Sequence, residues 1–88
     1  MNESQSDIAR IRAAIDELDA ELISLLSARA ELVLQMRRAK DEAGLDQFDP
    51  EREAEIQERL ASLNRGPLSD ADLQRIYEIL LDVMKSFG

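Results

Sequence analysis

The positively charged side chains are the residues whose placement points to chemistry, and Arg29 is the first of them. Arg29 falls on an a position of a heptad pattern whose other a positions are Ile15, Leu22 and Met36. A guanidinium in an apolar seam is costly unless an anion meets it there. Arg29 is therefore a candidate ligand for an anionic molecule. The competing interpretations are an ion pair with a carboxylate on another helix and a side chain that reaches out to solvent.

Arg12 and Lys40 share one face of the same predicted helix, because 28 residues, or four whole heptads, separate them. The rise between them is roughly 42 Å, too far for one small ligand to touch both within a single chain. An antiparallel pair of chains removes the difficulty. If Arg12 of one chain lies across from the stretch between Arg29 and Lys40 of the other, the two-fold axis falls near Ile23. Taken singly, each of these cations is more simply a solvated surface charge.

Arg52 and Glu53 are a second pair of candidates. They lie in the first turn of a helix that is expected to begin at Asp49-Pro50, where backbone N–H groups are free. A purely local interpretation is also open, because Glu53 favours the positive end of the helix dipole and Arg52 can pair with a neighbouring glutamate.

A helix from about Asp7 to Ala43 must position the first three cations. Ser6 or Asp7 is expected to cap its start, and Gly44 is expected to end it. About 36 residues would span roughly 54 Å, which is too long for a compact domain of this size. Such a helix needs a second copy alongside it, so we expect an antiparallel homodimer. Its apolar residues keep a 3-4 spacing: Ile8, Ile11, Ile15, Leu18, Leu22, Leu25, Leu32, Met36 and Ala39.

Two shorter helices are predicted after the long one. The first opens with Asp49 at the N-cap and Pro50 in the first turn, and Asn64–Pro67 stops it. The second opens at Ser69 with an S-x-x-D arrangement close to a capping box. No strand pattern is present, so the fold class is all-α: one long helix plus two shorter helices in a single domain, residues 1–88. The two apolar stripes are Ile56, Leu60 and Leu63, and Leu73, Ile76, Tyr77, Leu80, Met84 and Phe87.

The composition excludes several classes of function. The chain has no cysteine, histidine or tryptophan, so it lacks the commonest general base and metal ligand, and no metal site is expected. A net charge of −8 argues against nucleic-acid binding, and no apolar run has the length of a membrane span. The polar, acidic first residues do not resemble a signal peptide, so the expected compartment is the cytoplasm.

These motifs together resemble the all-helical chorismate mutase family. Residues 11–19 and 25–29 are similar to that family's N-terminal helix, residues 38–40 match its lysine segment, and residues 48–53 resemble the opening of its second helix. The resemblance covers roughly residues 8–82, with the motifs in the family's order and at its spacing. Mutase domains fused to other shikimate-pathway enzymes look similar too, so the chain is either a free-standing protein or an excised domain.

The resemblance implies an intertwined homodimer with two active sites, each built from both chains. By that resemblance, chorismate is rearranged to prephenate for aromatic amino-acid biosynthesis without a cofactor. Lys40 and Arg29 would be the catalytic residues, and Lys40 would also reach the ether oxygen. The substrate-binding residues would be Arg12 from the second chain with Arg29, Lys40, Asp49, Arg52, Glu53 and Met84. The cations would bind the two carboxylates, while Glu53 and the Asp49 region would orient the ring hydroxyl.

The third predicted helix departs from the family's pattern. Met84 stands where the family usually has a small polar residue, and Gly88 stands where it has Gln or Glu, which donates to the ether oxygen. Losing such a donor typically costs about 10²–10³ in rate. The alternatives are therefore a weakly active regulatory domain that binds chorismate or prephenate, with another shikimate-pathway enzyme as candidate partner, or a related isochorismate or aminodeoxychorismate enzyme. A plain helical interaction module is the remaining alternative.

Overall fold

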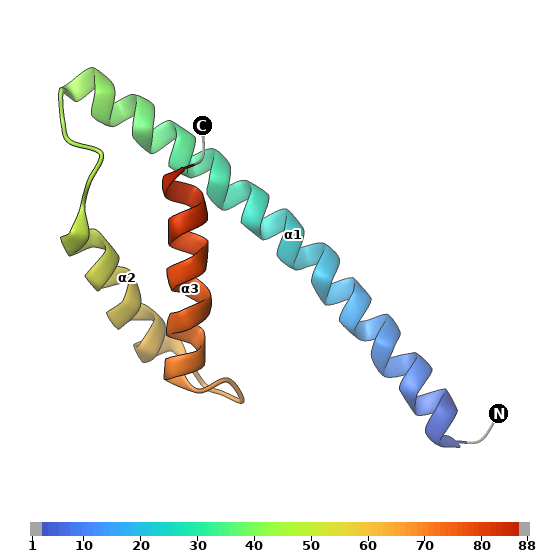
Figure 1. Ribbon diagram of the computed structural model, residues 1–88. Coiled ribbons are helices and arrows are strands. Elements are labelled where there is room, and N and C mark those ends of the chain that lie inside the picture. The colour runs from blue at the N-terminus through green and yellow to red at the C-terminus, as the bar shows by residue number, and fades with distance from the viewer. Residues whose placement is uncertain (1–2, 87–88) are drawn as a thin grey trace. The chain divides into compact units, whose positions relative to one another are not determined.

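The computed structural model describes residues 3–86, and within them it contains three helices and no strand. The helices are α1 (Glu3–Ala43), α2 (Pro50–Leu63) and α3 (Asp70–Lys85), labelled in Figure 1. The predicted all-helical class, with one long helix followed by two shorter ones, is confirmed.

Helix α1 begins four residues before the predicted start. It runs over 41 residues, about 61 Å at 1.5 Å per residue. Ser6 and Asp7 therefore lie inside the helix, and the prediction that one of them caps its start was wrong. The segment before them contains no proline or glycine, and serine and acidic side chains are well tolerated in a first helical turn, so nothing stops the helix from extending. The predicted end is confirmed: Gly44 follows with φ +70, a conformation that glycine adopts without strain.

The chain divides into two compact units, residues 1–32 and residues 33–88. The first contains most of α1. Its apolar stripe is exposed, since the large aliphatic side chains from Ile8 to Leu25 on the predicted a and d positions retain between 47% and 67% of their accessible surface. A stripe of that kind needs a covering surface.

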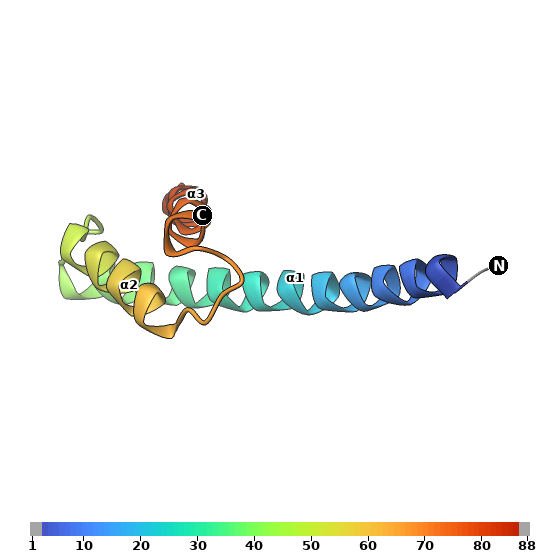
Figure 2. The same ribbon diagram turned by 90° about the horizontal axis from the view of Figure 1, so that it is seen from below.

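The second unit contains the last turns of α1 together with α2 and α3 (Figures 1 and 2). Helices α2 and α3 pack side by side, joined by the turn that Asn64 organises: its side-chain amide donates to the Leu68 carbonyl and to Asp70, both at 2.8 Å. The α3 stripe faces inward at Leu73, Tyr77, Leu80 and Met84, whereas Ile76 is 48% exposed. Phe87 lies outside the described residues.

The core of the chain is thin. Among residues 4–86, Met84 is the only residue that is largely buried, with 7% of its surface exposed. A domain of this length buries little apolar surface by itself. Polar contacts also connect the helix ends within residues 33–86.

Candidate functional site

The start of α2 is fixed by local contacts, and it positions two of the predicted residues. Asp49 is the N-cap: its carboxylate accepts a hydrogen bond from the Arg52 backbone N–H at 3.1 Å. Pro50 occupies the first turn, where the missing N–H costs nothing. One turn on, the Glu53 backbone N–H donates to the Asp49 carbonyl at 3.3 Å. Asp49 and Glu53 are thus set one helical turn apart, as their spacing predicted.

Lys40 reaches this helix start from the last turn of α1. Its Nζ lies 4.0 Å from Asp49 Oδ2 and 3.5 Å from the Gln47 carbonyl, and its side chain is only 19% exposed. Both contacts are long, so neither holds the ammonium tightly. An ammonium with only long contacts can exchange them for a shorter contact with an anionic ligand.

Gln47 braces the loop that joins α1 to α2. Its side-chain amide donates to the Arg37 carbonyl at 3.0 Å and to the Asp41 carboxylate at 2.8 Å. The loop is therefore tied back onto α1 on the turn that carries Lys40. This contact fixes the approach of Asp49 toward the Lys40 ammonium.

Arg37 ties the end of α3 to the same stretch of α1. Its Nη2 donates to the Met84 carbonyl at 2.9 Å, and it also donates to the Lys85 carbonyl. A cation at the end of a helix meets unsatisfied carbonyls and the negative end of the helix dipole. Arg37 and Lys40 lie one turn apart, so a single segment of α1 contacts both the start of α2 and the end of α3.

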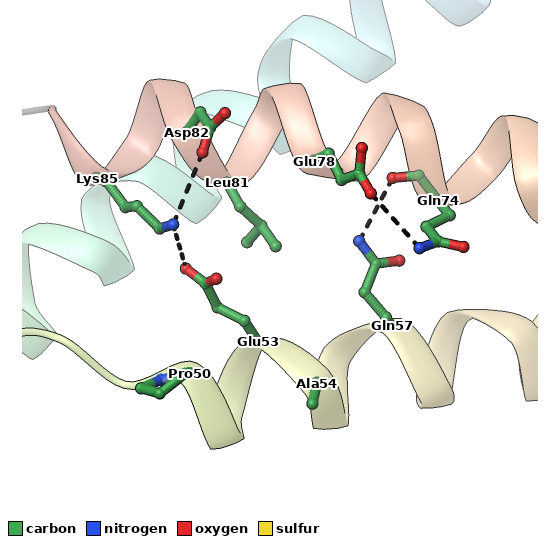
Figure 3. A pocket seen from close by; sticks show the side chains of 9 residues that line it. All are labelled: Pro50, Glu53, Ala54, Gln57, Gln74, Glu78, Leu81, Asp82 and Lys85. Carbon is green, nitrogen blue, oxygen red and sulfur yellow. Dashed lines mark hydrogen bonds and ion pairs between the residues drawn. The ribbon is translucent and has the colours of Figure 1, made fainter.

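Glu53 and Lys85 join α2 to α3. Lys85 Nζ lies 2.8 Å from Glu53 Oε1 and 3.7 Å from Asp82 Oδ1 (Figure 3). The hydrogen bond to Glu53 raises the pKa of Lys85 above its ordinary value of 10.5, against a smaller opposing effect of desolvation. Lys85 therefore remains charged throughout the neutral range. Together with the contacts of Arg37 and Lys40, its ion pair with Glu53 connects α1, α2 and α3.

The other predicted residues are distributed as follows. Arg52 is exposed and pairs with Glu55 at 3.4 Å, the local alternative that the sequence left open. Met84 lies on α3, where its carbonyl accepts the hydrogen bond from Arg37, and only 7% of its surface is exposed. Arg12, which is exposed, and Arg29, which is half-buried, lie in the unit of residues 1–32. Gly88 lies outside the described residues.

A cleft of about 420 Å³ runs between α2 and α3 (Figure 3). Of the predicted residues only Glu53 borders it, and one cation faces three carboxylates, so the cleft is unsuited to a dianion. Its walls are partly closed by the Gln57 amide, which donates to the Gln74 carbonyl at 3.4 Å. The lining residues are Pro50, Glu53, Ala54, Gln57, Gln74, Glu78, Leu81, Asp82 and Lys85.

Within residues 3–86, no three acidic, histidine or cysteine side chains gather closely enough to hold a metal ion. No helix in that range is both long enough and apolar enough to cross a bilayer.

Sequence reasoning missed three residues whose side chains make these contacts: Arg37, Gln47 and Lys85. Each is a polar residue at a position where polar residues are ordinary: beside an apolar stripe, in a loop, and in the last turn of a helix. A lysine in a last helical turn is already explained by the helix dipole, so its spacing carried no further signal.

Comparison with known proteins identifies a family for this arrangement. A sequence model of the family described as chorismate mutase type II matches residues 11–87. The chorismate mutase of Methanocaldococcus jannaschii is 31% identical over 80 residues, which cover 90% of this chain and 81% of that protein. A chorismate mutase structure from Thermus thermophilus (form I) superposes with a TM-score of 0.86 at 31% identity, covering 89% of this chain and 98% of that one.

Longer proteins also match. The bifunctional chorismate mutase/prephenate dehydratase of Neisseria gonorrhoeae is 36% identical over 66 residues, 75% of this chain. The chain spans only 18% of the length of that relative. The chain therefore matches one segment of the larger N. gonorrhoeae protein, whereas it matches most of the length of the M. jannaschii protein.

Proposed function

Because the chain belongs to the chorismate mutase type II family, we propose that it catalyses the rearrangement of chorismate to prephenate. The observation that carries the proposal is Lys40, a lysine with 19% of its side chain exposed and contacts of 4.0 and 3.5 Å. A lysine can pack its methylene stem against the protein while its ammonium stays accessible. An ammonium held in this way, with only long contacts to its neighbours, is suited to receive negative charge from a ligand.

The reaction needs little from the protein beyond geometry and charge. In one concerted step the ether C–O bond breaks and a C–C bond forms, with no proton transfer, nucleophile or redox change. Catalysis then consists of holding the folded conformer and placing positive charge where the breaking bond gathers negative charge. Lys40 supplies that charge at the ether oxygen in our proposal.

The remaining roles follow the family resemblance. Arg29 and Arg52 bind the substrate carboxylates from the same chain as Lys40, and arginine suits them because its planar fork is bidentate. Glu53, with Asp49 one turn before it, accepts from the ring hydroxyl. Met84 lines the site from α3, and Arg12 of the partner subunit completes the carboxylate pocket.

The partner is a second copy of this chain, and the exposed apolar stripe of the first unit supports that proposal. Its large aliphatic side chains from Ile8 to Leu25 on the a and d positions keep between 47% and 67% of their accessible surface. A second α1 packed alongside would cover such a stripe, which would then form the centre of the homodimer interface.

The activity is tested by following the loss of chorismate absorbance with purified protein. We expect turnover by the wild type and a loss of about 10²–10³ in kcat for Lys40→Ala. Arg75→Ala is the matched control, because Arg75 is a surface cation of the same unit with 75% of its side chain exposed, and its activity should equal that of the wild type. A wild-type chain that does not convert chorismate would refute the proposal.

The shared site is tested by mixing subunits. Light scattering at micromolar concentration should give twice the chain mass. Arg12→Ala and Lys40→Ala homodimers should each be weak, whereas a mixed dimer has one site with both lesions and one with neither. Mixing should therefore restore a measurable fraction of activity. Absence of rescue, with exchange verified by mass spectrometry, would mean that Arg12 and Lys40 do not act in one site.

A second candidate function is ligand binding with little catalysis, in a regulatory domain. The observation that favours it is Met84, a buried thioether where the family usually places a small polar group. Calorimetric titration separates the two functions, because a regulatory domain binds chorismate or prephenate without consuming chorismate. Addition of other shikimate-pathway enzymes to the assay tests whether a partner raises the rate.

A further inference from the structure

Lys85 places a positive charge beside the Glu53 carboxylate, which is expected to contact the ring hydroxyl of the substrate. Its Nζ lies 2.8 Å from Glu53 Oε1, across the space between α2 and α3 (Figure 3). The Glu53 side chain is 35% exposed and that of Lys85 is 50% exposed, so the pair is only partly screened by water. The two residues are 32 positions apart in sequence, and no motif joins them.

The contact leaves Glu53 able to accept a second hydrogen bond. A carboxylate has two oxygens and about four acceptor positions, and Lys85 contacts Oε1. A neutral hydroxyl can therefore donate to Glu53 while the ion pair stays intact. An approaching cation meets a different situation, because the negative charge of Glu53 is already compensated and Lys85 is a like charge beside it.

We propose that Lys85 is a specificity-determining residue that makes this site select a ring hydroxyl over a ring ammonium. The inference rests on the proposed function, in which Glu53 orients the ring substituent. With Lys85 in place, a substrate with a hydroxyl keeps its hydrogen bond to Glu53. An analogue with an amino group at the same carbon is protonated near neutral pH, as alkylamines are. Beside Lys85, that ammonium loses most of its attraction to the Glu53 carboxylate.

The second ion pair of Lys85 provides an internal control. Asp82 lies one turn before Lys85 on α3, its carboxylate is 3.7 Å from the ammonium, and its side chain is 77% exposed. This is an ordinary surface pair between residues i and i+3, which contributes little. Removal of Asp82 leaves the contact between Lys85 and Glu53 in place, so selectivity should not depend on Asp82.

The experiment compares chorismate with 4-amino-4-deoxychorismate as substrates. kcat/KM for each is measured with the wild type, Lys85→Met, Lys85→Arg and Asp82→Asn, and thermal melting verifies that each variant is folded. In Lys85→Met we expect the ratio of kcat/KM for the amino compound over chorismate to rise about tenfold. That is the effect of one charge acting over 4–6 Å at a partly exposed site. Lys85→Arg and Asp82→Asn should leave the ratio at the wild-type value.

Each other outcome has a definite meaning. An equal loss on both substrates in Lys85→Met would overturn the inference, because a merely structural tie between α2 and α3 cannot distinguish the substrates. If the wild type converts neither compound, the proposed activity fails, and the ratio of the two dissociation constants from calorimetry replaces the kinetic ratio. A ratio of dissociation constants that is unchanged by Lys85→Met would then overturn the selectivity inference independently.

Discussion

Replacement of Arg37 by alanine tests whether the contacts between helix ends stabilise the site. Arg37 Nη2 donates to the Met84 carbonyl at 2.9 Å and also to the Lys85 carbonyl, so Arg37→Ala leaves the C-terminus of α3 without its charged donor. The Met84 contact is partly buried, whereas the Lys85 contact is exposed. Most of the effect should therefore come from the first.

The magnitude follows from the kinds of contact that are lost. A hydrogen bond from a charged donor contributes about 1.5–3 kcal/mol, and a cation at a helix C-terminus contributes about 0.3–1 kcal/mol. With the exposed contact discounted, we expect Arg37→Ala to lower the free energy of unfolding by about 2 kcal/mol. For a chain of this size that is a fall in Tm of roughly 8–16 °C.

The assay is thermal melting at one fixed protein concentration, because the Tm of an oligomer depends on concentration. Arg38→Ala is the matched control, since Arg38 is the neighbouring exposed arginine of α1, and its Tm should stay close to that of the wild type. Arg37→Lys should recover part of the loss, because it keeps the charge but not the planar guanidinium whose Nη2 donates to both carbonyls.

The same variant should also lower kcat, because the end of α3 carries Met84 and Lys85. If Arg37→Ala melts at the same temperature as Arg38→Ala, the contacts at the end of α3 contribute nothing measurable. The idea that they hold the site together would then be refuted.

Four further outcomes are expected. Arg29→Ala should abolish chorismate binding in calorimetry while the protein stays folded, whereas a loss of several kcal/mol in stability would instead identify a structural ion pair. Ser69→Ala removes the hydroxyl that caps α3 at 3.0 Å and should cost about 1 kcal/mol in urea unfolding, while Ser62→Ala, within α2, should cost nothing. Because its folded pKa is raised above 10.5, Lys85 contributes stability fully below that pH, so the difference in urea midpoint between wild type and Lys85→Met should be constant between about pH 7 and 9 and vanish as pH rises further. Gly88→Gln, with a few helix-forming residues added after it, should raise kcat about tenfold or more, and a wild-type kcat already near 10 s⁻¹ would contradict that expectation.

Helix boundaries were the most predictable feature of the fold, because the signals that set them act within a few residues. Asp49 and Pro50 begin α2, Ser69 caps α3 and Gly44 ends α1, all as the sequence predicted. The one error concerned the start of α1, where two good capping residues lie within a helix that begins at Glu3. A capping residue favours a helix start but does not prevent the helix from extending upstream.

The candidate site was predictable only in part. Spacing alone placed Asp49 and Glu53 one turn apart, and the family's motifs associated Lys40 with them before any contact was known. The dimer and the roles of Arg12 and Arg29 remain predictions, because they depend on a surface that a second chain would supply.

The sequence by itself determined the helices, their order and the family, since caps, breakers and a repeating apolar stripe are local features of one chain. Only the tertiary structure decided which charges meet. Arg37 and Met84 are 47 residues apart, and Glu53 and Lys85 are 32 residues apart. An ion pair or hydrogen bond of that kind depends on where two helix ends lie in space, and its energy falls steeply over a few ångströms. No periodicity along the chain encodes that distance, which is why the contact between Lys85 and Glu53 became visible only in the folded protein.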